Sequence, residues 1–209
     1  SRAQRAPTPP PPHHAQNLPL PAQEEVTKVP YAKQERLPPW TMKDIRWTMG
    51  GYITACHVLA LIGLFYIPSC KAATLFWSFI LWPITGFGIT GGAHRLWSHR
   101  SYTAAASYRG VVMLFNSIAN QGTIWHWARD HRVHHFHSET VADPHDAIRG
   151  FWFAHIGWLY LKKDKRVAEA GSRVNMDDLR ADGFVMLQKN LVNCVSRWHV
   201  RTQDVGRGV

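Results

Sequence analysis

The chain has 209 residues, ten tryptophans and a formal net charge of +10 at pH 7, and it contains two long apolar runs. This combination is typical of a membrane protein rather than of an ordinary soluble domain. The basic residues are scattered and no nucleic-acid-binding signature accompanies them. The charge therefore argues against a nucleic-acid partner and favours an anionic membrane surface or an anionic substrate such as a phosphorylated carrier.

The N-terminal segment, residues 1–37, is rich in proline and poor in large apolar residues. Such a composition cannot bury a core, so we expect this segment to be disordered or polyproline-like. The chain begins at Ser1 without a signal peptide. We therefore expect a fragment or processed product that enters the membrane through internal spans.

Two apolar runs, residues 47–67 and 72–93, are each long enough to cross a hydrocarbon layer of about 30 Å as a helix. A short connector that carries Lys71 separates them, so they predict a two-span transmembrane hairpin. Further basic residues precede the first run and follow the second, which by the positive-inside rule places both ends of the hairpin in the cytosol. The predicted fold class is all-α: a helical membrane protein with this hairpin and cytosolic histidine-rich helices.

Nine of the thirteen histidines lie between residues 94 and 155. Two dense clusters stand out among them: His94 with His99, and His131 with His134 and His135. Buried imidazoles each need a hydrogen-bond partner or a metal, so packing alone explains such a density poorly. On an ideal α-helix the three histidines of the second cluster share a face, whereas the first pair points roughly 140° apart and can converge only near a helix end or by long reach. We predict a polyhistidine metal centre at the cytosolic mouth of the second span.

The remaining elements are expected outside the two spans. The apolar run 110–119 is too short to span, so it predicts an interfacial or docked helix. The segment from Trp125 through the second cluster predicts one helix. Residues 151–161 are aromatic and end in a basic run, which suits the headgroup boundary. Residues 177–189 predict a short amphipathic helix.

At the two clusters the sequence resembles the membrane acyl-CoA desaturases of the Δ9, stearoyl-CoA type. The matching text reads GAHRLWSHRSY at 92–102, WARDHRVHH at 127–135 and RGFWFAHIGW at 149–158. The similarity covers about residues 38–189, which we interpret as a partial fatty acid desaturase domain. A bare HxxHH would be a weak signal, but the combination of three long motifs is specific.

The resemblance implies a multi-pass enzyme of the endoplasmic reticulum membrane with cytosolic termini. Such an enzyme uses O₂ and electrons from cytochrome b5 to place a cis Δ9 double bond in a saturated fatty acyl-CoA, and a homo-oligomer is allowed. Breaking an aliphatic C–H bond exceeds what a side-chain acid or base can do, so a redox metal carries the step. The family implies a di-iron centre, although imidazole suits zinc and copper as well. No catalytic residue beyond the metal centre is expected, and the residues that match family ligands are His94, His99, His131, His134 and His135.

By the same resemblance, Arg129 and Asp130 match residues that contact the CoA portion, and Lys162 and Lys163 match a basic pair that binds it. Cations there have an independent rationale because CoA carries several phosphate charges. Simple membrane-surface charge is the alternative for these side chains. Trp127 is a candidate for the wall of the acyl tunnel, although an interfacial tryptophan fits equally well. Supporting or packing roles are assigned to His126, His137, His145 and His155.

The family pattern continues past residue 188 into two more spans and a third histidine box of the form HNxHH. Residues 190–209 are polar and basic and supply neither, so they are interpreted as a divergent tail. The sequence thus predicts a C-terminally truncated chain that is inactive alone. Two alternatives stay open: a catalytically dead membrane isoform that associates with desaturase chains, and a related di-iron membrane hydroxylase or zinc-dependent membrane hydrolase.

Overall fold

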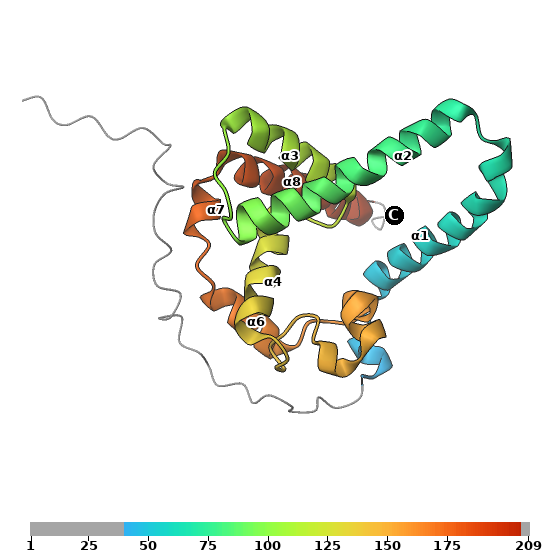
Figure 1. The fold of residues 1–209 in the computed structure, drawn as a ribbon. Helices are drawn as coiled ribbons and strands as arrows, with labels where there is room; N and C mark the ends of the chain where they lie inside the picture. Colours follow the sequence, from blue (N-terminus) through green and yellow to red (C-terminus); the bar gives the residue numbers. More distant parts are fainter. Residues whose placement is uncertain (1–39, 206–209) are drawn as a thin grey trace, which may run out of the picture.

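The computed structural model describes the backbone of residues 40–205 and the side chains of residues 40–194. The disorder expected for residues 1–37 lies outside the described residues. Within them no strand forms (Figure 1). An isolated antiparallel bridge pairs Ile45 with Leu161. The all-α prediction is confirmed. The helices in chain order are η3 Met42–Asp44, α1 Trp47–Tyr66, η4 Ile67–Ser69, α2 Ala72–Phe87, η5 Gly88–Ser98, α3 Ala106–Ala119, α4 Ile124–His137, η6 Ala147–Arg149, η7 Phe153–Gly157, α5 Trp158–Tyr160, α6 Lys165–Arg173, α7 Asp177–Ala181 and α8 Gly183–Val205.

Two long helical stretches correspond to the predicted spans. Trp47–Ser69 and Ala72–Ser98 are long and apolar enough to cross a membrane. The second stretch is longer than predicted because α2 runs without a break into η5 and ends only at Ser98. Large apolar side chains point away from the body, as with Phe65 at 84% exposed and Trp82 at 77%. Apolar surface on that scale matches a lipid environment.

The helix α3 docks against the end of the second stretch, as its length predicted (Figure 1). Val112, at the middle of α3, is fully buried in a core that α4 completes with Ile124 and Val133. Thr123 caps α4, since its Oγ1 accepts from the backbone N–H of His126. The second histidine cluster therefore lies on one continuous helix, as predicted, held between η5 and the C-terminal helices.

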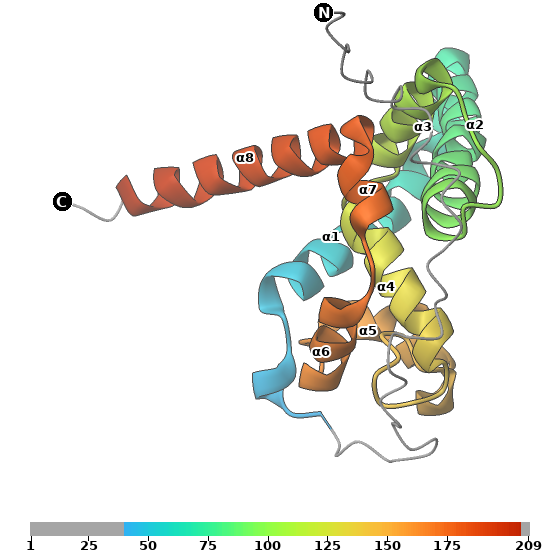
Figure 2. The same ribbon diagram turned by 90° about the vertical axis from the view of Figure 1, so that its left-hand side faces the viewer.

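The amphipathic helix predicted over residues 177–189 is instead two helices, and that prediction is wrong. Asp182 separates α7 from α8, because its carboxylate accepts from the backbone N–H groups of Phe184 and Val185 and caps the new helix. The helix α8 then continues to Val205 and projects from the body (Figure 2). The predicted tail is thus helical as far as the structure describes it.

Candidate metal centre

His94 and His99, the first cluster, lie at the end of the second candidate span. The segment η5 is π-helical, with backbone bonds between residues five apart. The N–H of His99 donates to the carbonyl oxygen of His94 at 3.0 Å, and the two Nε2 atoms are 3.1 Å apart. The pair lies at a helix end, as convergence required. The α-helical spacing assumed from the sequence is nevertheless wrong here, because π winding places residues five apart on one face.

Side-chain hydrogen bonds and close packing hold the π-helical segment. Ser98 Oγ donates to the carbonyl oxygen of Ala93 at 2.6 Å, and the Tyr102 hydroxyl donates to that of Gly91 at 2.7 Å. Gly88 approaches α3 so closely that a Cβ would lie 2.4 Å from the backbone nitrogen of Asn116. Only glycine allows that approach, which seats η5 on α3.

His131 and His135 meet the first cluster from α4. They are four residues apart and therefore share a face of the α-helix. The Nε2 atom of His131 lies 2.9 Å from that of His99 and 3.0 Å from that of His135. The structure brings together four of the five predicted ligands, whose ligand nitrogens all lie within 4.8 Å of one another: His94, His99, His131 and His135.

This arrangement suits a metal ion better than a hydrogen-bond network. A neutral imidazole Nε2 offers either one N–H or one lone pair. His99 and His131 each meet two neighbouring Nε2 atoms, so hydrogen bonds cannot satisfy every contact. A cation can accept a lone pair from each nitrogen. At a metal–nitrogen distance of about 2.1 Å, two ligands at right angles are about 3.0 Å apart, which agrees with the contacts between neighbouring rings.

Burial keeps three of these four imidazoles neutral. Burial lowers the pKa of His131 to about 3, helped by the charges of His135, His94 and His99 when protonated. Burial is also the main cause that lowers the pKa of His99 and of His135. Only the neutral ring has a free lone pair for a metal. These three histidines are therefore in their ligating protonation state at neutral pH.

His134, the fifth predicted ligand, belongs to a second group with Asp143 and His145. Its Nδ1 lies 2.9 Å from Oδ1 of Asp143, whose side chain is 1% exposed. Burial raises the pKa of Asp143, but the hydrogen bonds from His134 and from the backbone N–H groups of His145 and Glu139 hold it below the usual value. A carboxylate on Nδ1 leaves Nε2 of His134 as the nitrogen that can face a metal.

A cavity of about 780 Å³ adjoins both histidine groups. Its wall includes His131 from the first group and His145 from the second. All five residues predicted to bind substrate line it: Trp127, Arg129, Asp130, Lys162 and Lys163. Apolar surface comes from three further residues: Met49, Trp158 and Leu159. The cavity thus joins cationic and apolar side chains to histidines of both candidate metal groups.

Comparison with known proteins identifies the family. No protein-family model matches the chain. The chain is 46% identical over 168 residues to the acyl-CoA Δ9 desaturase of Acheta domesticus, an alignment that covers 80% of this chain and 46% of that protein. It is also 46% identical over 166 residues to the acyl-CoA desaturase of Cyprinus carpio, covering 79% and 50% of the two chains. The chain belongs to the acyl-CoA desaturase family. The stearoyl-CoA desaturase of Sus scrofa is 48% identical over 133 residues, covering 64% of this chain and 37% of its own.

This desaturase-family chain spans about half the length of the curated relatives it matches. Within it, Trp127 stacks on His131 with ring centroids 4.9 Å apart, and both side chains line the cavity. Asp130 accepts from Arg129 at 3.0 Å and from Lys163. Lys162 donates to the backbone carbonyl oxygen of Lys43 at 2.7 Å.

Two charged residues of the site were not singled out from the sequence. Asp143 could have been suspected, because a carboxylate a few residues beyond a histidine-bearing helix is a frequent partner of a ligating imidazole. Arg46 also lines the cavity, yet in the sequence it is only one of the basic residues that precede the first apolar run. Its position follows from tertiary pairing, since its backbone N–H donates to the carbonyl oxygen of Tyr160 at 2.7 Å.

Proposed function

We propose that this chain forms the histidine-cluster part of a fatty acyl-CoA Δ9 desaturase, an oxidoreductase that places a cis double bond in a saturated acyl-CoA with O₂ and electrons from cytochrome b5. The proposal rests on the convergence of four imidazole nitrogens beside a cavity lined by cations. The proposed iron ligands are His94, His99, His131, His135 and, oriented by Asp143, His134. A bound di-iron centre supplies the redox chemistry that an unactivated acyl chain requires.

The chain's own residues bind and orient the substrate. Arg129, Lys162 and Lys163 present positive charge to the phosphates of CoA, and Arg46 adds a fourth cation to the same wall. Asp130 pairs with Arg129 and Lys163 and so fixes their positions. Trp127 presents an apolar ring beside His131, which suits an acyl chain directed toward the metal ligands.

The proposed location is the endoplasmic reticulum membrane, with the hairpin crossing twice and both its ends in the cytosol. Two candidate spans and the placement of basic residues support this orientation. His94 and His99 stand at the end of the second candidate span, which would put the metal at the cytosolic surface.

Metal binding by the purified chain tests the proposal. The 209-residue chain, loaded anaerobically with Fe²⁺ in detergent, should retain iron, and His99→Ala and His131→Ala should lose most of it. The matched control is His137→Ala, which changes the last residue of α4, outside both histidine groups. Iron retention unchanged in His99→Ala and His131→Ala, or equally reduced in His137→Ala, would contradict the proposed centre.

Activity of the 209 residues is a separate question. When the chain is expressed alone in desaturase-deficient cells, we expect neither oleate nor palmitoleate to form. Either product would overturn the prediction that it is inactive alone. A hydroxylated fatty acid in place of an unsaturated one would favour the hydroxylase alternative.

A further inference from the structure

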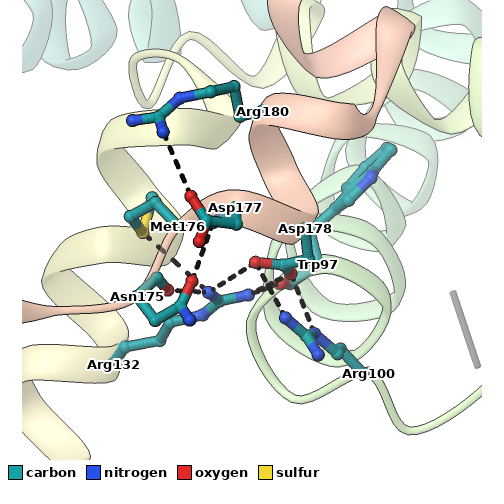
Figure 3. Close-up of polar contacts among 8 residues, drawn as sticks. All are labelled: Trp97, Arg100, Arg132, Asn175, Met176, Asp177, Asp178 and Arg180. Carbon is teal, nitrogen blue, oxygen red and sulfur yellow. Dashed lines mark hydrogen bonds and ion pairs between the residues drawn. The ribbon is translucent and has the colours of Figure 1, made fainter. Parts of the chain in front are cut away.

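Asp178 on α7 holds two arginine side chains at once (Figure 3). Its Oδ2 accepts from Nη2 of Arg132 at 2.6 Å and from Nε of Arg100 at 2.8 Å. Its Oδ1 accepts from Nη1 of Arg132 at 3.0 Å and from Nη2 of Arg100 at 2.8 Å. Each guanidinium thus contacts the carboxylate through two nitrogens. Such bidentate pairs are stronger and more specific in geometry than single hydrogen bonds.

The two arginines come from the two histidine clusters. Arg132 follows His131 directly on α4, and Arg100 follows His99 directly after η5. Arg132 also donates through Nη2 to the carbonyl oxygen of Trp97 at 2.7 Å, so it reaches across from α4 into η5. Asp178 is therefore the common partner of two side chains adjacent to the two histidines whose Nε2 atoms are 2.9 Å apart.

The backbone at Arg100 adds a second reason for a fixed contact. Its φ is +51°, in the left-handed region that a residue with a Cβ rarely adopts. Such a conformation persists where the surrounding contacts hold it. The pairing of Arg100 with Asp178 is one such contact, and it lies immediately after His99.

Burial makes the contact costly to break. The side chains of Arg132 and Asp178 are 8% and 14% exposed. Burial raises the pKa of Asp178, but the hydrogen bonds and charges of Arg132 and Arg100 hold it below the usual value, so the carboxylate is ionised at neutral pH. Four residues after Asp178, the carboxylate of Asp182 accepts from Nε1 of Trp97 at 3.1 Å. This hydrogen bond is a further contact that holds η5.

We propose that Asp178 is a positioning residue that fixes the two histidine clusters against each other through Arg100 and Arg132. Its contacts set the approach of η5 to α4 and hence the meeting of the ligand nitrogens. Its importance for the metal rests on the proposed function, whereas its effect on the backbone around His99 does not.

The test uses the full 209-residue chain in detergent and Co²⁺ as the metal probe. Asp178→Asn keeps the shape of the side chain and removes its charge. We expect Co²⁺ affinity to fall by about 10–100-fold and the Co²⁺ ligand-field spectrum to change, as when a residue that orients metal ligands is lost. A merely stabilising residue would leave the spectrum unchanged. The matched control is Asp177→Asn, the preceding residue on α7, which is 75% exposed and paired with Arg180 at the surface.

A second readout is amide hydrogen exchange over residues 97–101 without metal. Asp178→Asn should accelerate exchange there and Asp177→Asn should not. If Asp178→Asn fails to fold, Arg100→Gln, which leaves the pair of Arg132 with Asp178 intact, takes its place in both measurements. Wild-type affinity, spectrum and exchange in the folded variant would overturn the inference. If the wild-type chain binds no Co²⁺, the proposed function fails, and exchange alone then decides the positioning role.

Discussion

The backbone N–H of His99 donates to the carbonyl oxygen of His94, 3.0 Å away and five residues earlier. This single bond marks the π winding that turns both imidazoles toward α4. A metal site built from an i, i+5 pair therefore depends on backbone geometry as much as on ligand identity. π-helical turns occur frequently at functional sites, where they re-aim side chains.

Gly88 begins the π-helical segment, and its replacement tests that dependence. In Gly88→Ala the new Cβ would lie 2.4 Å from backbone atoms of Phe115 and Asn116, which cannot yield as a flexible side chain could. We expect a loss of about 1–3 kcal/mol in the free energy of unfolding, the usual cost of overpacking, and weaker metal binding. Unfolding in mixed detergent micelles, followed by circular dichroism, measures the first effect.

The control for this change is Gly86→Ala on the same helical stretch. A Cβ at Gly86 meets nothing within 4 Å, so alanine there brings its better helix propensity without a clash. We expect no loss of stability from this variant. If both changes destabilise the chain equally, the loss in Gly88→Ala does not come from its contact with α3.

Asp143 offers a second prediction, because it holds Nδ1 of His134 at 2.9 Å. In Asp143→Asn the negative partner of the imidazole is lost, and iron affinity should fall by about 10–100-fold. The control is Asp146→Asn in the same loop, a buried residue that caps η6 through the N–H of Ile148. Asparagine caps equally well, so this variant should bind iron normally. Iron titrations of the two variants separate orientation of His134 from general disturbance of the loop.

The helices could be predicted from the sequence because their signals are local. Hydropathy and length sufficed for both candidate spans, and the run 110–119 was correctly judged too short to span; of the two predicted forms, interfacial or docked, it is docked. The break at Asp182 was missed because an aspartate inside an amphipathic pattern gives no sign that it will cap a new helix.

The histidines were recognised from their density, but their grouping required the fold. Spacing alone assigned His134 the same face as its neighbours, whereas it turns toward Asp143, nine residues on. The convergence of His94 with His99 depends on π winding, for which residue types give no periodic signal. The ion pair between Asp178 and Arg132 joins residues 46 apart in the sequence, so only the tertiary structure reveals it.

Lys163 lines the cavity and Lys165 does not, although both are exposed lysines of one short segment. In Lys163→Ala, we expect stearoyl-CoA to bind about fivefold more weakly, which corresponds to about 1 kcal/mol for a partly exposed charge. Lys165→Ala should leave affinity unchanged. The difference should shrink at high salt, because counterions screen the phosphates. Calorimetric titrations at two ionic strengths measure both effects, and equal losses in the two variants would indicate nonspecific surface charge.

Asp178 also predicts how stability depends on pH. Its pKa in the folded chain is held below the usual value by Arg132 and Arg100, despite burial. A carboxyl group of this kind stabilises the fold above its unfolded pKa of about 3.9, and the stabilisation is lost as pH falls through the folded value. Asp178→Asn should therefore cost about 3 kcal/mol at pH 7, because it leaves a buried arginine without its charged partner.

The gap in unfolding free energy between wild type and Asp178→Asn should stay constant from neutral pH down to about 5 and narrow progressively below about 4, as pH falls toward the lower pKa of the folded chain. Protonated Asp178 then resembles asparagine, and both chains share every other titrating group. Detergent unfolding of the two chains across this range measures the gap. Asp177→Asn should show little gap at any pH, since its ion pair with Arg180 is exposed. A gap for Asp178→Asn that does not narrow as pH falls from about 5 to about 3 would mean that shape, rather than charge, accounts for the residue's contribution.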